Sequence, residues 1–155
     1  MQLRRYRAED LPILAHLFGE TVRRVNSRDY APPQVQAWAA GEADLLTRDS
    51  WFQRLYTLVA EADGRIVGYG NVDDTGYLDH LFVRWDCQGQ GIATALCDAL
   101  EAHCRELGVD AVTVHASKTA LPFFLRRGYR VEREQQMPVR GQVLTNYAMR
   151  KELRR

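Results

Sequence analysis

The sequence has no long apolar segment. Nowhere in its 155 residues do about 18 apolar residues follow one another, which is the length that a membrane-spanning helix needs. The first residues, Met-Gln-Leu-Arg-Arg, lead into polar sequence rather than into the apolar core of a signal peptide. We therefore expect a cytoplasmic protein that has no membrane as a partner.

Cysteine is scarce, with three residues in the whole chain. Cys87, Cys97 and Cys104 are odd in number, and they form no Cys-x-x-Cys pair and no Cys/His group with metal-ligand spacing. A disulfide framework needs paired cysteines, and a zinc site needs grouped ligands. The sequence therefore predicts neither disulfides nor a metal site, and we expect buried thiols.

An excess of charge of either sign is also missing. The formal net charge is +1 at pH 7, which gives too weak a field to predict nucleic acid as a partner. With 155 residues, of which 46% are hydrophobic, the chain is long enough to bury one sizeable core and too short for two ordinary domains. We expect a single domain over residues 1–155, and its function must be inferred from local motifs.

The first third of the chain predicts one strand and several helices. Residues 3–7 are typical of a strand. Pro32 and Pro33 favour the start of a short helix, and residues 51–55 indicate a further helical turn. Between the strand and the prolines, apolar residues recur at the spacing of an amphipathic helix: Leu11, Leu14, Phe18, Val22 and Val25.

The middle of the chain predicts three antiparallel strands and a long helix. Two short runs rich in β-branched residues flank the pair Asp63-Gly64, a strong hairpin signal. A second turn, residues 73–76, leads into a third strand over residues 77–83. Residues 91–107 then have the apolar spacing of a helix, and Gly108 is a typical helix stop.

The last third predicts a strand, a short helix and a hairpin. Residues 111–115 are typical of a strand, and Thr119 is placed to cap a helix with Pro122 in its first turn. Residues 129–136 and 142–151 then predict a final hairpin. Helices and strands alternate without a repeat, so the whole chain is predicted to be one mixed α/β unit.

The most informative motif is the glycine-containing turn at residues 88–93, between a predicted strand and the long helix. Backbone N–H groups at a helix N-terminus favour an anion such as a pyrophosphate. No Gly-Lys-Ser or Gly-Lys-Thr follows, which excludes the phosphate loop of nucleotide triphosphatases. Thr94 and His115 stand where a dinucleotide-binding fold needs a small residue and an acid, so that reading fails too.

The sequence resembles the GNAT superfamily of N-acetyltransferases. Its acetyl-CoA motif, Gln/Arg-x-x-Gly-x-Gly/Ala, is matched by Gln88, Gly91 and Ala93. The stretches RRYRAEDLPILAHLF, LDHLFV, SKTALPFFLRRGY and NYAMRKEL extend the resemblance over nearly the whole chain. The resemblance implies an α/β fold with a mixed, mostly antiparallel central sheet flanked by helices. The implied order is β-α-α-β-β-β-α-β-α-β-β, with two central strands splayed apart.

The resemblance also implies acetyl-CoA as the cofactor. Backbone N–H groups of the turn would hold the CoA pyrophosphate, and the end of the preceding strand would pair with the pantetheine arm between the splayed strands. Ser117 stands where the family commonly has an asparagine that faces the cofactor. The implied cofactor-binding residues are Leu81, Phe82, Val83, Gln88, Gly89, Gln90, Gly91, Ile92, Ala93, Ser117 and Phe124.

Transfer of the acetyl group to an amine requires a base, a polarised carbonyl and a proton for the leaving thiolate. Strand alternation predicts Tyr77 and Asp79 on one face and Leu78 and His80 on the other, unless a bulge shifts the count. Family members often carry an acidic or histidine base on this strand, so Asp79 with Tyr77 is our predicted catalytic pair. A structural aspartate and a packed His80 are the alternatives.

The predicted acid differs from the family pattern. Four residues before Gly128, where the family usually has a tyrosine, this chain has Phe124, which cannot donate a proton. Tyr147 in the last strand and a water molecule are two candidate replacements, and a core role for Tyr147 is a third possibility. The acceptor pocket is expected from residues 25–38 and 137–141.

Two functions therefore remain open at this stage. The first is an acetyltransferase that modifies a primary amine of a small molecule or peptide, and the second is a non-catalytic acyl-CoA-binding or regulatory module. Phe124 favours the second, whereas Asp79 and Tyr77 favour the first. The sequence is compatible with a monomer or a homodimer.

Overall fold

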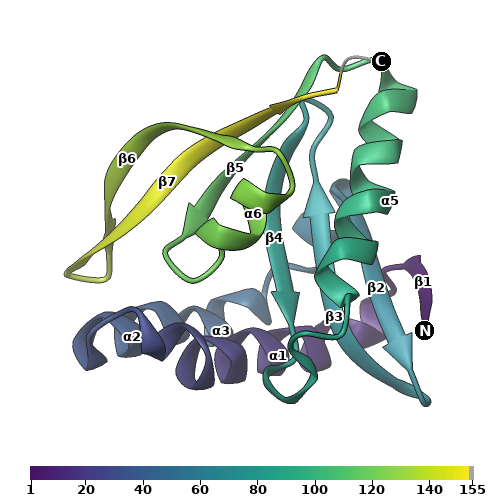
Figure 1. The fold of residues 1–155 in the computed structure, drawn as a ribbon. Coiled ribbons are helices and arrows are strands. Elements are labelled where there is room, and N and C mark those ends of the chain that lie inside the picture. The colour runs from purple at the N-terminus through teal and green to yellow at the C-terminus, as the bar shows by residue number, and fades with distance from the viewer. Residues whose placement is uncertain (154–155) are drawn as a thin grey trace.

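A seven-stranded sheet in the order β1-β2-β3-β4-β5-β7-β6 forms the centre of the protein (Figure 1). The computed structural model describes residues 1–153. Only β4 and β5 run parallel; the other neighbours are antiparallel, which confirms the predicted mixed sheet. The strands are β1 (Gln2–Arg5), β2 (Tyr56–Ala62), β3 (Arg65–Val72), β4 (Tyr77–Val83), β5 (Ala111–Ser117), β6 (Arg130–Val139) and β7 (Gln142–Glu152).

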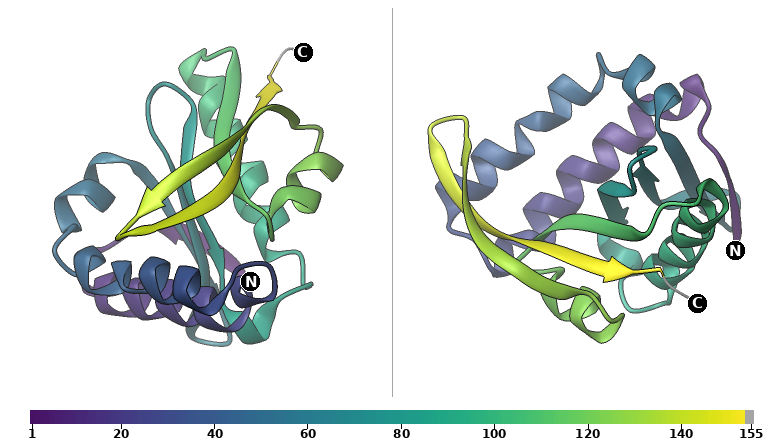
Figure 2. Two further views of the ribbon diagram at one scale, coloured as in Figure 1. Left: turned by 90° about the vertical axis from the view of Figure 1, so that its left-hand side faces the viewer. Right: turned by 90° about the horizontal axis from the view of Figure 1, so that it is seen from above.

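Helices cover both faces of the sheet, as Figure 2 shows, with α1 and α2 side by side on one face and α5 on the other. The α-helices are α1 (Leu11–Arg24), α2 (Pro32–Ala39), α3 (Gly41–Leu45), α4 (Asp49–Arg54), α5 (Ile92–Leu107) and α6 (Leu121–Arg126). Three short 3₁₀ turns join them: η1 (Ala8–Asp10), η2 (Asn26–Arg28) and η3 (Trp85–Cys87). The order agrees with the prediction, apart from α3, which the sequence pattern did not indicate.

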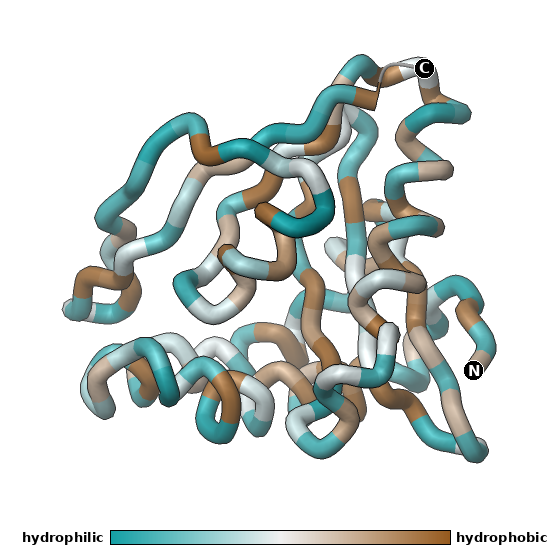
Figure 3. The backbone as a smooth tube through the Cα atoms, in the orientation of Figure 1, coloured by the Kyte–Doolittle hydropathy of each residue, from teal (hydrophilic) through white to brown (hydrophobic). Residues whose placement is uncertain are grey.

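Each face of the sheet has its own apolar core. Leu14, Phe18 and Val22 on α1 are buried against the sheet, as their spacing predicts. On the opposite face, Leu96 and Leu100 of α5 are buried in a second cluster. Figure 3 shows apolar segments where helices and strands face one another, whereas the β6–β7 hairpin is largely hydrophilic. The sheet is therefore a shared wall between two cores.

The β2–β3 hairpin forms at the predicted turn. Both Asp63 (φ 53°) and Gly64 (φ 77°) have positive φ, the backbone that a two-residue type I′ turn requires. Gly108 likewise has φ 82° where it ends α5. These boundaries were predictable because each depends on a local backbone conformation that glycine favours.

The prediction of Thr119 as a helix cap is wrong. Helix α6 begins at Leu121, Ala120 is its N-cap, and no side chain caps it. Instead the backbone N–H of Ala120 donates to Ser117 Oγ at 3.1 Å. Ser117, at the end of β5, accepts this hydrogen bond, so the hydroxyl of Thr119 does not cap the helix.

Strands β4 and β5 separate soon after they meet. Their ladder contains only two residue pairs, Tyr77 with Thr113 and Leu78 with Val114. Beyond these pairs β4 continues along β3, whereas β5 pairs with β7 as far as Ser117. The predicted splay of the central strands is confirmed, and it leaves strand edges facing one another across a gap in the ladder.

A register shift in β4 changes which side chains share a face. Asn71 of β3 is opposite His80 and Val72 is opposite Leu78, so Asp79 is the extra residue of a β-bulge. As a result His80 and Phe82 contact the α1 core, whereas Leu78 packs in the α5 core. The prediction that Leu78 and His80 share a face is therefore wrong, because the bulge interrupts the alternation between them.

Candidate active site

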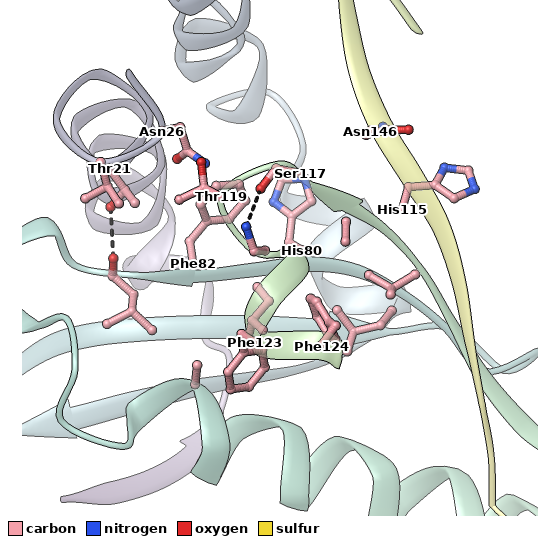
Figure 4. A pocket seen from close by; sticks show the side chains of 18 of the residues that line it. Thr21, Asn26, His80, Phe82, His115, Ser117, Thr119, Phe123, Phe124 and Asn146 are labelled. Atoms are coloured by element: carbon pink, nitrogen blue, oxygen red, sulfur yellow. Dashed lines mark hydrogen bonds between the residues drawn. The ribbon is translucent and has the colours of Figure 1, made fainter. Parts of the chain in front are cut away.

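A cavity of about 690 Å³ occupies the space between the diverging ends of β4 and β5 (Figure 4). Its walls come from α1, α2, β4, the turn before α5, β5, α6 and the β6–β7 hairpin. Because so many elements contribute, the cavity exists only in the complete fold. Most of the residues predicted to bind the cofactor or to act in catalysis line this cavity.

The glycine-containing turn forms one end of the cavity. Gly91 has φ 82° and is the N-cap of α5, and Gly89 has φ 73°. A Cβ added at either glycine would meet no atom within 4 Å, so the requirement for glycine here is conformational. The first N–H groups of a helix lack intrahelical acceptors and carry partial positive charge. This end of the cavity therefore suits an anion.

Gln88 fixes the start of this turn. Its Nε2 donates to the backbone oxygens of Val83 at 2.8 Å and Arg84 at 3.3 Å. Thr21 Oγ1 of α1 also donates to the Val83 oxygen, at 3.1 Å. The matching glutamine of the predicted motif thus ties the turn to the end of β4 and, through Val83, to α1.

The backbone of β4 presents free groups to the cavity. The N–H of Arg84 donates to Val67 on β3, so by the alternation of antiparallel strands the N–H groups of Leu81 and Val83 point away from β3. They face the side where β5 has diverged. An extended ligand placed there can pair with β4 as an added strand would.

Most of the predicted cofactor-binding residues are brought together here. Gln90 is not part of the cavity wall. The predicted residues that line it are Leu81, Phe82, Val83, Gln88, Gly89, Gly91, Ile92, Ala93, Ser117 and Phe124. Helix α6 buries Phe124 to 2% exposure, with its ring edge-on to Tyr129.

Asp79 and Tyr77 both line the cavity, but they are not hydrogen-bonded to each other. Tyr77 Oη lies 3.4 Å from His115 Nδ1. Burial, together with the nearby negative charge of Asp79, raises the pKa of Tyr77 to about 12. Asp79 is accessible from the cavity, yet the loss of surrounding water raises the pKa of its carboxyl, which Arg48 partly opposes. Asp79 is therefore a stronger base than an ordinary aspartate.

His80 is a further titratable group at the cavity wall. Its Nδ1 lies 2.9 Å from Tyr69 Oη, and its ring stacks on Phe18 and meets the edge of Trp51. Burial, with Arg48 nearby, lowers the pKa of His80 to about 4, so the ring is neutral at pH 7. Its backbone N–H donates to Asn71 Oδ1 at 2.9 Å, which fixes the bulge beside Asp79.

Tyr147 is not part of the cavity wall. It is half-buried on β7 opposite Ala116 and packs against the core cluster that contains Phe124. Its neighbour Asn146 lines the cavity instead. Adjacent residues on a strand point to opposite faces, so Asn146 faces the cavity and Tyr147 does not.

Thr119 is a functional candidate that the sequence did not indicate. Its Oγ1 is buried, lines the cavity and has no hydrogen-bond partner among the described residues. A buried hydroxyl without a partner costs about 1–3 kcal/mol, so such groups are rare unless a ligand or water uses them. In the sequence, the position of Thr119 before a predicted helix indicated a helix cap and not a ligand contact.

Tyr30 closes the end of the cavity opposite the glycine turn. Its hydroxyl donates to the Thr145 backbone oxygen at 2.6 Å and accepts the Lys118 N–H at 2.9 Å. Gln34 Nε2 donates to the Val143 oxygen at 2.8 Å, and Arg140 pairs with Asp44. The segment around α2 thus holds the β6–β7 hairpin over the cavity.

The arrangement fits the cofactor that the sequence implies. One cavity contains a helix N-terminus that suits a pyrophosphate, the outward-pointing N–H groups of β4 that suit an extended arm, and the unpaired Thr119 hydroxyl. Among residues 1–153 no group of three or more His, Cys, Asp or Glu side chains is placed to hold a metal ion. In the same part of the chain, no helix combines the length and apolar character needed to cross a bilayer.

Known proteins share this sequence and fold. The family model described as an acetyltransferase (GNAT) domain matches residues 26–152. The uncharacterized N-acetyltransferase YafP of Escherichia coli (strain K12) is 33% identical over 153 residues, which cover 97% of this chain and 95% of that protein.

Solved structures agree with the sequence comparisons. A GCN5-related N-acetyltransferase from Rhodopseudomonas palustris has a TM-score of 0.94 and 31% identity, covering 97% of this chain and 94% of its own. The PaiA N-acetyltransferase of Thermoplasma acidophilum, crystallised in complex with coenzyme A, has a TM-score of 0.75 at 17% identity, covering 97% of this chain and 98% of its own. At that identity the second likeness shows the fold alone.

Proposed function

This chain belongs to the GNAT acetyltransferase family, and from that premise we propose that it acetylates a primary amine of a small molecule or peptide. Acetyl-CoA is its acetyl donor and supplies the reactive thioester. The observation that carries the proposal is the cavity between β4 and β5, which runs from the glycine turn to Asp79 and His80. The family assignment favours the enzyme over a non-catalytic binding module.

We assign the cofactor end to the turn and the end of β4. The N–H groups of residues 88–93 would hold the pyrophosphate, and those of Leu81 and Val83 would hold the pantetheine arm. Gln88 and Thr21 keep this surface in place, because both bind the Val83 oxygen. Phe124 and Ser117 would border the arm on the β5 side.

We propose Asp79, with Tyr77 beside it, as the group that receives the proton of the amine. Its position at the bulge and its raised pKa support this role. His80 is the competing base, because it lines the same wall and is neutral at pH 7. A base role for His80 requires its Nδ1–H to donate to Tyr69, which leaves Nε2 free to accept.

The leaving thiolate needs a proton donor other than Phe124. Phe124 has no acidic hydrogen, so we keep Tyr147 and a water molecule as the two proposed donors. The position of Tyr147 outside the cavity wall favours water. We also propose that the protein is cytoplasmic, because Cys87, Cys97 and Cys104 are free thiols of the kind that persist in reducing compartments. For its assembly we propose a monomer or a homodimer.

Thermal unfolding tests the cofactor assignment. A ligand that binds only the folded protein raises its melting temperature, so acetyl-CoA should raise it and ATP and NAD should not. Gly91→Asp should abolish the shift, because it places a carboxylate at the pyrophosphate site. Gly108→Asp is the matched control, since Gly108 also has φ 82° and open space at its Cβ, but lies at the other end of α5.

The control separates strain from binding. Both variants should lower the melting temperature of the protein alone, because an aspartate at positive φ is strained. Only Gly91→Asp should lose the response to acetyl-CoA. A larger shift with NAD, or an unchanged acetyl-CoA response in Gly91→Asp, would remove the turn from the cofactor site.

A further inference from the structure

The end of the cavity beyond Asp79 and His80 is built mainly from apolar and aromatic side chains. Phe18 and Val25 come from α1 and the residue after it, and Trp38 comes from α2. Met137, Val139 and Leu144 extend this wall from the β6–β7 hairpin. We call these six residues the acceptor wall.

Charge is nearly absent from the same cavity. Among the described residues that line it, Asp79 is the one carboxylate and Arg126 of α6 the one lysine or arginine. The polar groups near the acceptor wall are neutral: the amides of Asn26 and Asn146 and the ring of His80. A single cationic centre therefore finds one counter-charge, at Asp79.

A second cationic centre on the same ligand would find none. It would have to lose water against Trp38, Met137 or Leu144, and an unpaired buried charge is strongly unfavourable. An apolar body gains free energy at the same surface in proportion to the area that it buries. Trp38 also offers a ring edge or face to an aromatic ligand, and Met137 adapts to its shape.

The acceptor wall also limits ligand size. The cavity of about 690 Å³ has to contain the end of the cofactor as well as the acceptor. Hydrogen bonds made by Tyr30, Gln34 and Arg140 hold the hairpin against α2 and the residues beside it, so this side of the cavity is fixed in position. A small molecule fits this space better than a polypeptide segment.

From these observations we propose that the acceptor is a small monoamine with an apolar, preferably aromatic, body. This inference rests on the proposed function and specifies its substrate class. In the reaction the amine nitrogen forms a bond to the acetyl carbon as the carbon–sulfur bond breaks. The amine loses one proton and the thiolate gains one, so the products are an N-acetylated amine and free CoA.

A panel of amines tests the substrate class. Phenethylamine and tryptamine represent the proposed class, propylamine lacks the ring, and spermidine, kanamycin and a lysine-containing peptide represent polycationic or peptide acceptors. Release of CoA thiol gives kcat/KM for each. The aromatic monoamines should exceed spermidine and kanamycin by at least about tenfold, the ratio that about 1.4 kcal/mol of differential binding gives.

Substitutions in the acceptor wall connect this preference to the structure. Trp38→Ala should raise KM for tryptamine by about tenfold while leaving propylamine nearly unchanged, and Trp38→Phe should restore most of the loss. Trp85→Ala is the control, because Trp85 is a 37% exposed tryptophan outside the cavity wall. Met137→Glu should shift the preference toward spermidine by adding a second carboxylate.

The outcomes separate this inference from the proposed function. If acetyl-CoA stabilises the protein but spermidine, kanamycin or the peptide is the best acceptor, the monoamine class is wrong and the acetyltransferase stands. Stabilisation with no turnover of any aromatic amine likewise overturns the class. Equal losses for tryptamine and propylamine in Trp38→Ala would show that the wall does not select the ring. Failure of acetyl-CoA to bind would overturn the proposed function itself.

Discussion

At the scale of single residues, Asp79 and His80 are adjacent in the chain, but their pKa values are shifted in opposite directions. Desolvation raises the pKa of the Asp79 carboxyl and lowers that of the His80 imidazole to about 4. The His80 ring is therefore neutral at pH 7, and the Asp79 carboxylate binds a proton more strongly than an ordinary aspartate does, so each group is a candidate proton acceptor. Their pKa values alone do not choose between them.

Substitution distinguishes the two bases. Asp79→Asn keeps size and strand geometry but removes the base, so kcat should fall by about 10²-fold if Asp79 accepts the proton. His80→Gln should then retain most of the activity. The measurement is steady-state turnover with the best amine, and an intact acetyl-CoA shift in melting temperature shows that each variant still folds.

The reverse result assigns the base to His80. In that case Tyr69→Phe should also lower turnover, because it removes the partner of His80 Nδ1. Tyr147→Phe and Tyr77→Phe complete the set: a loss near 10²-fold in Tyr147→Phe would identify the thiolate donor, and full activity would leave water. Wild-type turnover in every one of these variants would refute the whole catalytic assignment.

The Thr119 hydroxyl, which has no hydrogen-bond partner among the described residues, can be tested for a role in ligand binding. Thr119→Val keeps the shape and removes a buried, unpaired hydroxyl, so the protein without ligand should become more stable by about 1 kcal/mol. If the Thr119 hydroxyl binds the cofactor arm, the same change should weaken acetyl-CoA binding about fivefold, because that hydrogen bond is lost. Thermal unfolding and titration calorimetry give the two quantities.

A satisfied threonine provides the comparison. Thr47 Oγ1 donates to the Asp44 backbone oxygen at 2.7 Å, outside the cavity wall. Thr47→Val should therefore lower stability slightly and leave acetyl-CoA binding unchanged. If Thr119→Val behaved in the same way, its hydroxyl would have a structural partner and no role toward the cofactor.

At the scale of elements, the sequence predicts what local chemistry determines. The α1 helix follows from apolar spacing, and the β2–β3 turn follows from Asp63-Gly64. The glycine turn before α5 is predictable for the same reason, since Gly91 at positive φ is a property of the chain itself. Most of the proposed cofactor end could therefore be located before the structure was known.

The remaining features depend on tertiary contacts that no local pattern contains. The bulge at Asp79 is fixed by Asn71, a residue on the neighbouring strand. Thr119 does not cap α6 because Ser117 reaches the helix first. The acceptor wall joins α1, α2 and the β6–β7 hairpin, which are far apart in the sequence: Gln34 of α2 and Val143 of β7, which are hydrogen-bonded, are separated by 109 positions. Sequence spacing cannot predict such a surface.

Tyr30, which lies just before α2, bonds to Thr145 of β7 and to Lys118 after β5, and the effect of removing its hydroxyl should be measurable. Tyr30→Phe deletes one donor and one acceptor, leaving the Thr145 oxygen and the Lys118 N–H unpaired. We expect a loss of about 1–3 kcal/mol in the free energy of unfolding. KM for the acceptor amine should rise because the hairpin is held less firmly. An unchanged melting temperature would mean that solvent replaces both bonds.

At the scale of the whole molecule, Glu101 joins α5 to the C-terminal half. This residue is 2% exposed and accepts hydrogen bonds from Arg127 Nε at 2.7 Å, Tyr129 Oη at 2.7 Å and Lys151 Nζ at 2.9 Å. Burial acts to raise the pKa of Glu101, but these donors outweigh it, so its pKa lies below the ordinary value of 4.5. The network stabilises the charged form.

Glu101→Gln should therefore lower the free energy of unfolding at pH 7 by about 3 kcal/mol, because it leaves Arg127 and Lys151 without their buried counter-charge. Since the folded pKa is depressed, the stabilisation is present above pH 4.5 and is lost as the pH falls through the folded value. The difference between variant and wild type should shrink on acidification. Denaturant unfolding at several pH values measures it.

Glu106→Gln on the exposed side of the same helix is the control and should change stability little at any pH. A Glu101→Gln variant as stable as wild type at pH 7 would show that the ion pairs of the network offset no more than their desolvation.

The strand order has a consequence for how the protein is made. Strand β7 lies between β5 and β6, although it is the last of the three to be synthesised. While the chain leaves the ribosome, β5 therefore has no partner on that side, and the tip of β6 has nothing to pair with until residues 142–152 emerge. The amino-terminal strands β1–β4 can pair much earlier. The nascent protein is thus expected to expose an open strand edge until residues 142–152 emerge, and an open edge can pair with other chains and promote aggregation.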